Sequence, residues 1–175
     1  DYEEFRWAMG DTVTVPLLQK AFADRLPLKE AHRKLMRDFR LYMLVGGMPQ
    51  AVAGYVESRD FGRVDHVKRQ IIRLYRNDIH KYAKGYEAKV TKVFDTIPSQ
   101  LQKHEKKFLL KALSEEARMR DYETSFFWLA DAMIVNMAYN TPAPDIGLGI
   151  NVEDSTLKCY MADTGLLLSH AFSDR

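Results

Sequence analysis

The sequence predicts a mainly α-helical fold, in which a helical bundle over residues 1–85 is followed by a winged-helix-like unit over residues 86–175. Its 175 residues are 46% apolar and 29% charged, a composition that can form a buried core and differs from that of disordered or fibrous chains. Apolar residues recur at steps of three and four along most of the chain, which is the spacing of one helical face. Near the C-terminus this spacing gives way to two short alternating segments, which predict a small two-stranded β wing.

Four short helices are expected in the first sixty residues. The first covers residues 2–9, and the next two begin near residue 14 and after residue 27. Their ends are marked by residues that favour helix termini, because glycine adopts the left-handed conformation easily, proline fits the first turn and threonine can cap. These residues are Gly10, Thr14, Pro16, Pro27, Gly46, Gly47 and Pro49.

The longest periodic stretch begins after Asp60, which is placed to cap it, and continues to Gly85. A further helix over residues 87–97 is expected to end at Pro98, because proline removes a backbone donor. A short helix over residues 108–113 and a longer one over residues 122–133, capped by Asp121, should follow.

The two predicted strands cover residues 134–139 and 157–161. They are separated by a long turn region containing two prolines and two glycines, and they pair with each other if this region forms a hairpin. Asp163 then caps a final apolar helix that includes Gly165.

Charge is distributed unevenly along the chain, although the net charge is only +2. Residues 63–120 contain 15 Lys and Arg against 7 Asp and Glu, whereas residues 121–175 contain 2 against 8. The first interpretation is that these charges line the solvated faces of long helices. The alternative is that the basic middle segment contacts a polyanion or an acidic partner.

No catalytic constellation is visible, so we expect that this chain by itself is not an enzyme. The phosphate-binding pattern G-x-x-x-x-G-K-[ST] is absent, and no two histidines have the spacing of a zinc site. We therefore predict no metal site and no cofactor in this chain. The single cysteine, Cys159, is expected to be a buried inert thiol, and it favours a reducing, cytoplasmic compartment. No membrane-spanning segment and no signal peptide are predicted.

The predicted recognition helix and wing are unsuited to reading DNA. Residues 122–133 contain no Lys or Arg but include Glu123 and Asp131, and the wing carries Asp145, Glu153 and Asp154. Phosphate binding needs cations, because counterion release supplies most of the affinity. Tyr122 and Trp128 are first expected in the core, with a protein interface as the alternative. Non-specific contact with DNA phosphates remains open through Lys68, Arg69, Arg73, Arg76, Lys81, Arg118 and Arg120.

Five runs, over residues 1–10, 42–52, 75–82, 97–101 and 158–167, together resemble one family. Their order and content are similar to the region after the ATPase core in prokaryotic AAA-type (P-loop) ATPases that end in a C-terminal domain of unknown function. The resemblance implies that an ATPase domain using ATP and Mg precedes this chain in a longer protein, and that a nuclease-like region can follow it. The chain, which lacks an initial Met, is accordingly expected to be part of that protein.

In this setting the expected function is a non-catalytic accessory region that couples ATP hydrolysis elsewhere in the parent protein to a partner, expected to be a protein. The alternative is a DNA-binding winged-helix module that contacts phosphates non-specifically through residues 63–120. Gly46 and Gly47 are weak candidates for a hinge that senses the nucleotide state, or for an anion contact made by backbone N–H groups. A plain turn between two helices is the simpler interpretation of this glycine pair.

Overall fold

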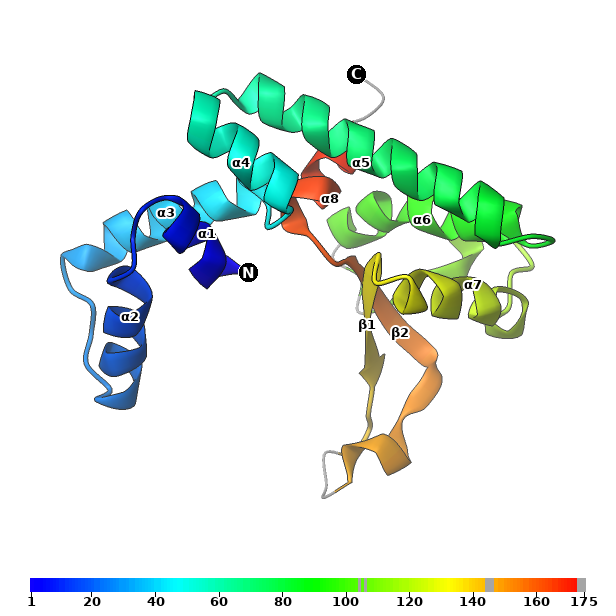
Figure 1. Ribbon diagram of the computed structural model, residues 1–175. Coiled ribbons are helices and arrows are strands. Elements are labelled where there is room, and N and C mark those ends of the chain that lie inside the picture. Colours follow the sequence, from blue (N-terminus) through cyan, green and yellow to red (C-terminus); the bar gives the residue numbers. More distant parts are fainter. Residues whose placement is uncertain (104, 106, 144–146, 173–175) are drawn as a thin grey trace. The chain divides into compact units, whose positions relative to one another are not determined.

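The computed structural model describes residues 1–103, 105, 107–143 and 147–172 (Figure 1). It is mainly helical with a small two-stranded antiparallel sheet, which confirms the predicted fold class. The chain divides into two compact units, one formed by Asp1–Ile71 with Asp163–Ser173 and the other by Ile72–Ala162. The units divide at Ile71/Ile72 inside α5 rather than at the predicted residue 85, and the last helix joins the first unit because it packs on the third.

The first unit is built only of helices. Its core consists of Phe5, Val45, Ala51, Val52, Tyr55 and Val64. Pro49 is at the start of the fourth helix and Gly46, with φ +88°, ends the third, as the sequence predicted. The helices are α1 (Tyr2–Ala8), α2 (Thr14–Ala23), α3 (Ala31–Val45), α4 (Pro49–Ser58), the first part of α5 (Phe61–Tyr82), and α8 (Thr164–Ala171).

Thr14 does not cap α2, contrary to the sequence prediction. The helix begins at Thr14 itself, and the Asp11 carboxylate accepts the backbone N–H groups of Val13 at 3.0 Å and Thr14 at 2.9 Å. Asp11 thus forms a turn that leads into α2, and the helix itself has no side-chain cap.

A buried arginine on α1 forms ion pairs with the loop before α2 and with α3. The Arg6 side chain on α1 is 7% exposed and pairs with Asp11 and, at 2.9 Å, with Asp38 on α3. The hydroxyl and backbone N–H of Thr14, together with Arg6, hold the pKa of Asp11 well below its usual range. Burial raises the pKa of Asp38, but hydrogen bonds from Lys34 and Arg6 outweigh it, so that this pKa is also lowered.

We expect the first unit to lose stability in acid for this reason. A carboxylate whose pKa is depressed by folding stabilises the protein above its unfolded pKa, near 3.8, and this contribution is lost as the pH falls toward the folded pKa. Asp11→Asn should lower the urea midpoint at pH 7 and flatten its decline below pH 4. Asp24→Asn, which removes an exposed carboxylate at the end of α2, should keep the parent profile. If the urea midpoints of Asp11→Asn and the parent changed equally with pH, the stabilising role of the Asp11 carboxylate would be contradicted.

The second unit places helices beside a β ribbon (Figure 1). β1 pairs antiparallel with β2 from Val135↔Met161 to Asn140↔Glu153, which confirms the predicted wing, although β2 begins four residues earlier than predicted. Phe108 N–H donates to the Leu157 carbonyl at 2.8 Å, so the segment before the 3₁₀ turn also binds the ribbon. The elements after α5 are α6 (Glu87–Gln102), η1 (Leu110–Ala112), α7 (Met119–Asp131), β1 (Val135–Asn140), η2 (Leu148–Asn151) and β2 (Glu153–Met161).

Two predicted helix boundaries in this unit were wrong. α6 continues through Pro98 to Gln102, because its buried face continues and the Gln100 side chain binds both backbone groups of Leu109. α7 begins at Met119, three residues earlier than predicted, and Asp121 accepts the Arg118 N–H from inside the first turn. The expected helix over residues 108–113 is the shorter η1. His104 and Asp145 lie outside the described residues.

Candidate functional site

The glycine pair between α3 and α4 is held by a distant aspartate. The Asp163 carboxylate accepts the Gly47 N–H at 2.6 Å through Oδ2 and the Leu166 N–H at 2.7 Å through Oδ1. The second bond is the helix cap that the sequence predicted, and the first joins residues 116 positions apart. Asp163 is only 7% exposed; its bond to Leu166 is buried and its bond to Gly47 is partly buried. We call this arrangement the Asp163 clasp.

The helix that Asp163 caps lies directly against the end of α3. A Cβ added at Gly165 would be 2.5 Å from the Val45 carbonyl oxygen and 2.7 Å from Gly46 Cα, so only glycine fits there without a backbone shift. The Gly46–Gly47 turn is thus pinned in this structure. The Gly47 N–H is bound to a carboxylate and is not open to a bound anion, which corrects the anion-binding expectation for this donor.

Two of the seven predicted DNA contacts, Lys68 and Arg69, instead make hydrogen bonds and an ion pair within the first unit. Lys68 is 4% exposed and its Nζ donates to the Leu44 carbonyl at 2.8 Å. Burial lowers the pKa of Lys68, and Asp65 and Asp163 partly offset that effect. Arg69 pairs with Asp65 at 2.6 Å and donates to the Phe172 carbonyl at 3.1 Å. The prediction that Lys68 meets a phosphate is therefore wrong, because its ammonium group is inside the protein.

The other five predicted contacts belong to the second unit. Arg76 pairs with Asp95 at 2.8 Å, and Lys81 lies 4.7 Å from the centre of the Tyr82 ring. Arg73 is exposed. Because α7 starts at Met119, the exposed Arg118 and Arg120 lie at the N-terminal end of the would-be recognition helix.

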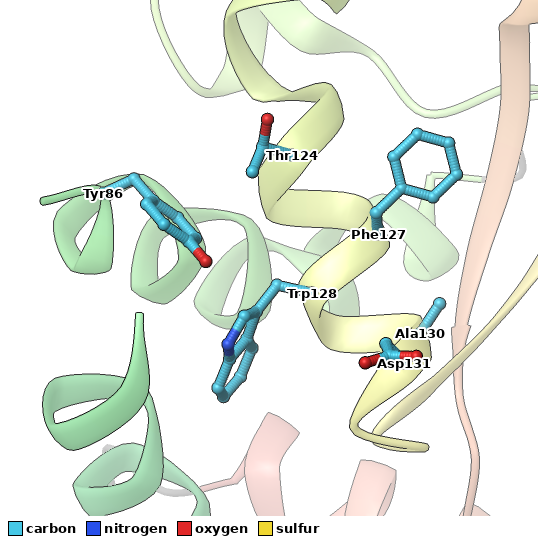
Figure 2. Close-up of a pocket in the computed structure, with 6 residues that line it drawn as sticks. All are labelled: Tyr86, Thr124, Phe127, Trp128, Ala130 and Asp131. Atoms are coloured by element: carbon cyan, nitrogen blue, oxygen red, sulfur yellow. The ribbon is translucent and has the colours of Figure 1, made fainter. Parts of the chain in front are cut away.

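An aromatic surface on α7 was anticipated only as an alternative, because the sequence analysis placed Trp128 first in the core. Tyr122 is buried as expected, but Trp128 is only half-buried and lines two hollows, of about 480 Å³ and about 240 Å³. Figure 2 shows the larger one, with the Tyr86 ring directed toward the Trp128 indole. The larger hollow is lined by Tyr86, Thr124, Phe127, Trp128, Ala130 and Asp131. The smaller is lined by Tyr75, Asp78, Tyr82, Trp128, Asp131, Ala132 and Ile134. We call this the Trp128 surface.

Two carboxylates border the Trp128 surface. Asp131 lines both hollows and Asp78 lines the smaller one, and both are exposed. Within the described part of the chain, neither carboxylate makes a hydrogen bond or an ion pair. A usable signal was present in the sequence, because Tyr75, Asp78 and Tyr82 have the spacing of one helical face.

Metal ligands and the cysteine thiol are the remaining chemical features of the described residues. These residues contain no group of three or more His, Cys, Asp or Glu side chains that could hold a metal ion. Cys159 is buried, as predicted, and burial raises its pKa to about 12, so its thiol is protonated at neutral pH. None of the described helices is long and apolar enough to cross a membrane.

Comparison with known proteins identifies a family. A family model described as a domain of unknown function (DUF8612) matches residues 36–174. The match begins inside α3 and extends past α8, so it includes the Asp163 clasp and the Trp128 surface. No curated protein and no solved structure matches the chain.

Proposed function

The chain belongs to the DUF8612 family, and we propose that within it these residues are a non-catalytic region that couples an ATPase domain elsewhere in the same protein to a protein partner. The position of the Asp163 clasp carries this proposal. The second unit ends at Ala162 and the returning segment of the first begins at Asp163. β2 ends at Met161, two peptide bonds before Asp163, so in this proposal a displacement of β2 would act directly on the residue that holds the α3–α4 turn.

The resemblance to AAA-type ATPases supports the same proposal. Two of the five resembling runs, over residues 42–52 and 158–167, contain the two halves of the Asp163 clasp. In this proposal the ATP and Mg belong to the preceding ATPase domain, and the hinge expected at Gly46–Gly47 becomes a turn released when the clasp opens.

The test is ATP turnover by the full-length protein. Asp163→Ser keeps a side chain able to cap α8 but too short to hold Gly47, and it should change turnover several-fold. The control is Asp60→Ser, since Asp60 also binds a backbone N–H, that of Gly62 at 2.7 Å, but its hydrogen bonds in the described residues are local and do not reach the α3–α4 turn. Equal turnover in both variants and the parent would overturn the coupling function. So would a parent reading frame without G-x-x-x-x-G-K-[ST] upstream of Asp1.

A DNA-binding module is the second candidate, and the early start of α7 favours it. Recognition helices present their N-terminal residues to DNA, and Arg118 and Arg120 occupy that end of α7. The rest of the exposed face of α7, with Glu123, Phe127 and Asp131, carries no cation, which favours a protein partner.

Titration of a random-sequence duplex at several salt concentrations separates the two candidates. We expect no binding at low salt if the partner is a protein. A DNA module would instead bind with steep salt dependence, and the double variant Arg118→Gln, Arg120→Gln would weaken binding about tenfold or more. Lys68→Met is the matched control, because its charge is buried and should not matter to DNA. Fluorescence anisotropy of a labelled duplex measures the binding affinity of the parent, the double variant and the control.

A further inference from the structure

We propose that the Trp128 surface binds an arginine side chain of the protein partner, with the guanidinium group against the aromatic rings and the Asp131 carboxylate. This inference rests on the proposed function, because it names the chemistry by which the partner is recognised. It also goes beyond it, since it assigns a binding site to residues for which the resemblance gives no role.

The first argument is the chemistry of the surface. The rings of Trp128 and Tyr86 line the larger hollow, and those of Tyr75 and Tyr82 line the smaller one. Aromatic faces carry negative potential and attract cations, tryptophan most strongly. Lys81, whose Nζ lies 4.7 Å from the centre of the Tyr82 ring, already makes this contact at the edge of the surface.

The second argument is charge complementarity. Asp131 borders both hollows and Asp78 the smaller, and no described lysine or arginine lines either of them. Neither carboxylate has an ion-pair partner within the described part of the chain. Among the described residues, Asp78 interacts electrostatically with Lys81, whereas no such interaction is seen for Asp131, so a partner that brings a positive charge would meet its main acceptor at Asp131.

The shape of the guanidinium group explains the choice of arginine over lysine. Arginine is planar, so it can stack on a ring while its N–H groups reach a carboxylate in the same plane. Trp128 and Asp131 are three residues apart on α7 and therefore lie on one face of that helix, which offers a ring and a carboxylate together. Phe127 is 54% exposed and adds apolar area for the methylene stem of the side chain.

A peptide titration tests the proposal on this chain. The chain contains two tryptophans, so the Trp7→Phe variant leaves Trp128 as the one fluorescent indole. The probe is a blocked peptide of alternating glycine and arginine. Parallel peptides replace each arginine with lysine, or with citrulline, which has the same shape but no charge. We expect saturable fluorescence change with the arginine peptide, and at least tenfold weaker binding of the citrulline peptide.

Matched variants locate the site. In the same background, Asp131→Asn should weaken binding of the arginine peptide about three- to tenfold, whereas Glu123→Gln should leave it unchanged. Glu123 is an exposed carboxylate on the same helix that lines neither hollow, so it controls for general charge. Both side chains are exposed, and thermal unfolding verifies that both variants remain folded.

Several results would overturn the inference. These are no saturable change, equal affinity for the citrulline peptide or the lysine peptide, and equal effects of the two substitutions. Binding of the arginine peptide with unchanged ATP turnover in Asp163→Ser would refute coupling and leave the arginine site standing. Altered turnover without peptide binding would refute the site and leave coupling standing.

Discussion

Gly165→Ala is expected to lower the free energy of unfolding of the first unit by about 3 kcal/mol. The added Cβ would be 2.5 Å from the Val45 carbonyl oxygen and 2.7 Å from both Gly46 Cα and Gly46 N. All three are backbone atoms, so no side chain can rotate away to make room. Either α8 or the α3–α4 turn must shift, and the Asp163 clasp between them weakens with it.

Gly54→Ala is the matched control for this prediction. Gly54 lies inside α4, and a Cβ added there has no atom within 4 Å, so alanine should stabilise the helix by about 0.5–1 kcal/mol. Urea unfolding measures the free energy of unfolding of both variants. In a Trp128→Phe background the remaining tryptophan, Trp7, belongs to α1 and reports on the first unit. Equal effects of the two alanine substitutions would contradict the close approach at Gly165.

Asp163→Ala should lower the free energy of unfolding of the same unit by about 2–3 kcal/mol. Loss of the α8 cap accounts for about 1 kcal/mol. The remainder comes from the Gly47 N–H, which loses a charged acceptor in a partly buried position. Asp163→Ser should recover the cap but not the bond to Gly47.

The difference between the alanine and serine variants therefore measures the long-range bond separately from the cap. Urea midpoints of the parent and the two variants give this comparison. If serine restored full stability, the bond between Asp163 and Gly47 would contribute nothing, and the clasp would reduce to an ordinary helix cap.

The sequence predicted most of the secondary structure, because helix ends depend on local chemistry. Gly46, Pro49 and the capping role of Asp163 follow from backbone preferences that act over a few residues. Pro98 violated such a preference, since contacts of Gln100 with Leu109 hold the last turn of α6. Local rules were overridden there by packing.

The candidate sites were predicted less well, because they depend on contacts between distant residues. No local pattern joins Asp163 to Gly47, and no charge count distinguishes the buried Lys68 from the exposed Arg73. Trp128 was first expected in the core, with a protein interface as the alternative, because aromatic residues on amphipathic helices usually lie in the core. The Trp128 side chain is partly exposed because it lines a hollow between Tyr86 and α7, and this hollow depends on tertiary packing.

The return of the chain at Asp163 also has a consequence for biosynthesis. The chain is synthesised from its N-terminus, so all of Ile72–Ala162 is made before α8, and the first unit can be completed only after the second has been synthesised. During that interval the end of α3 lacks the helix that covers it in the finished protein. A transcript truncated ahead of residue 163 would thus yield a complete second unit attached to an unfinished first one, which quality-control proteases would be expected to degrade.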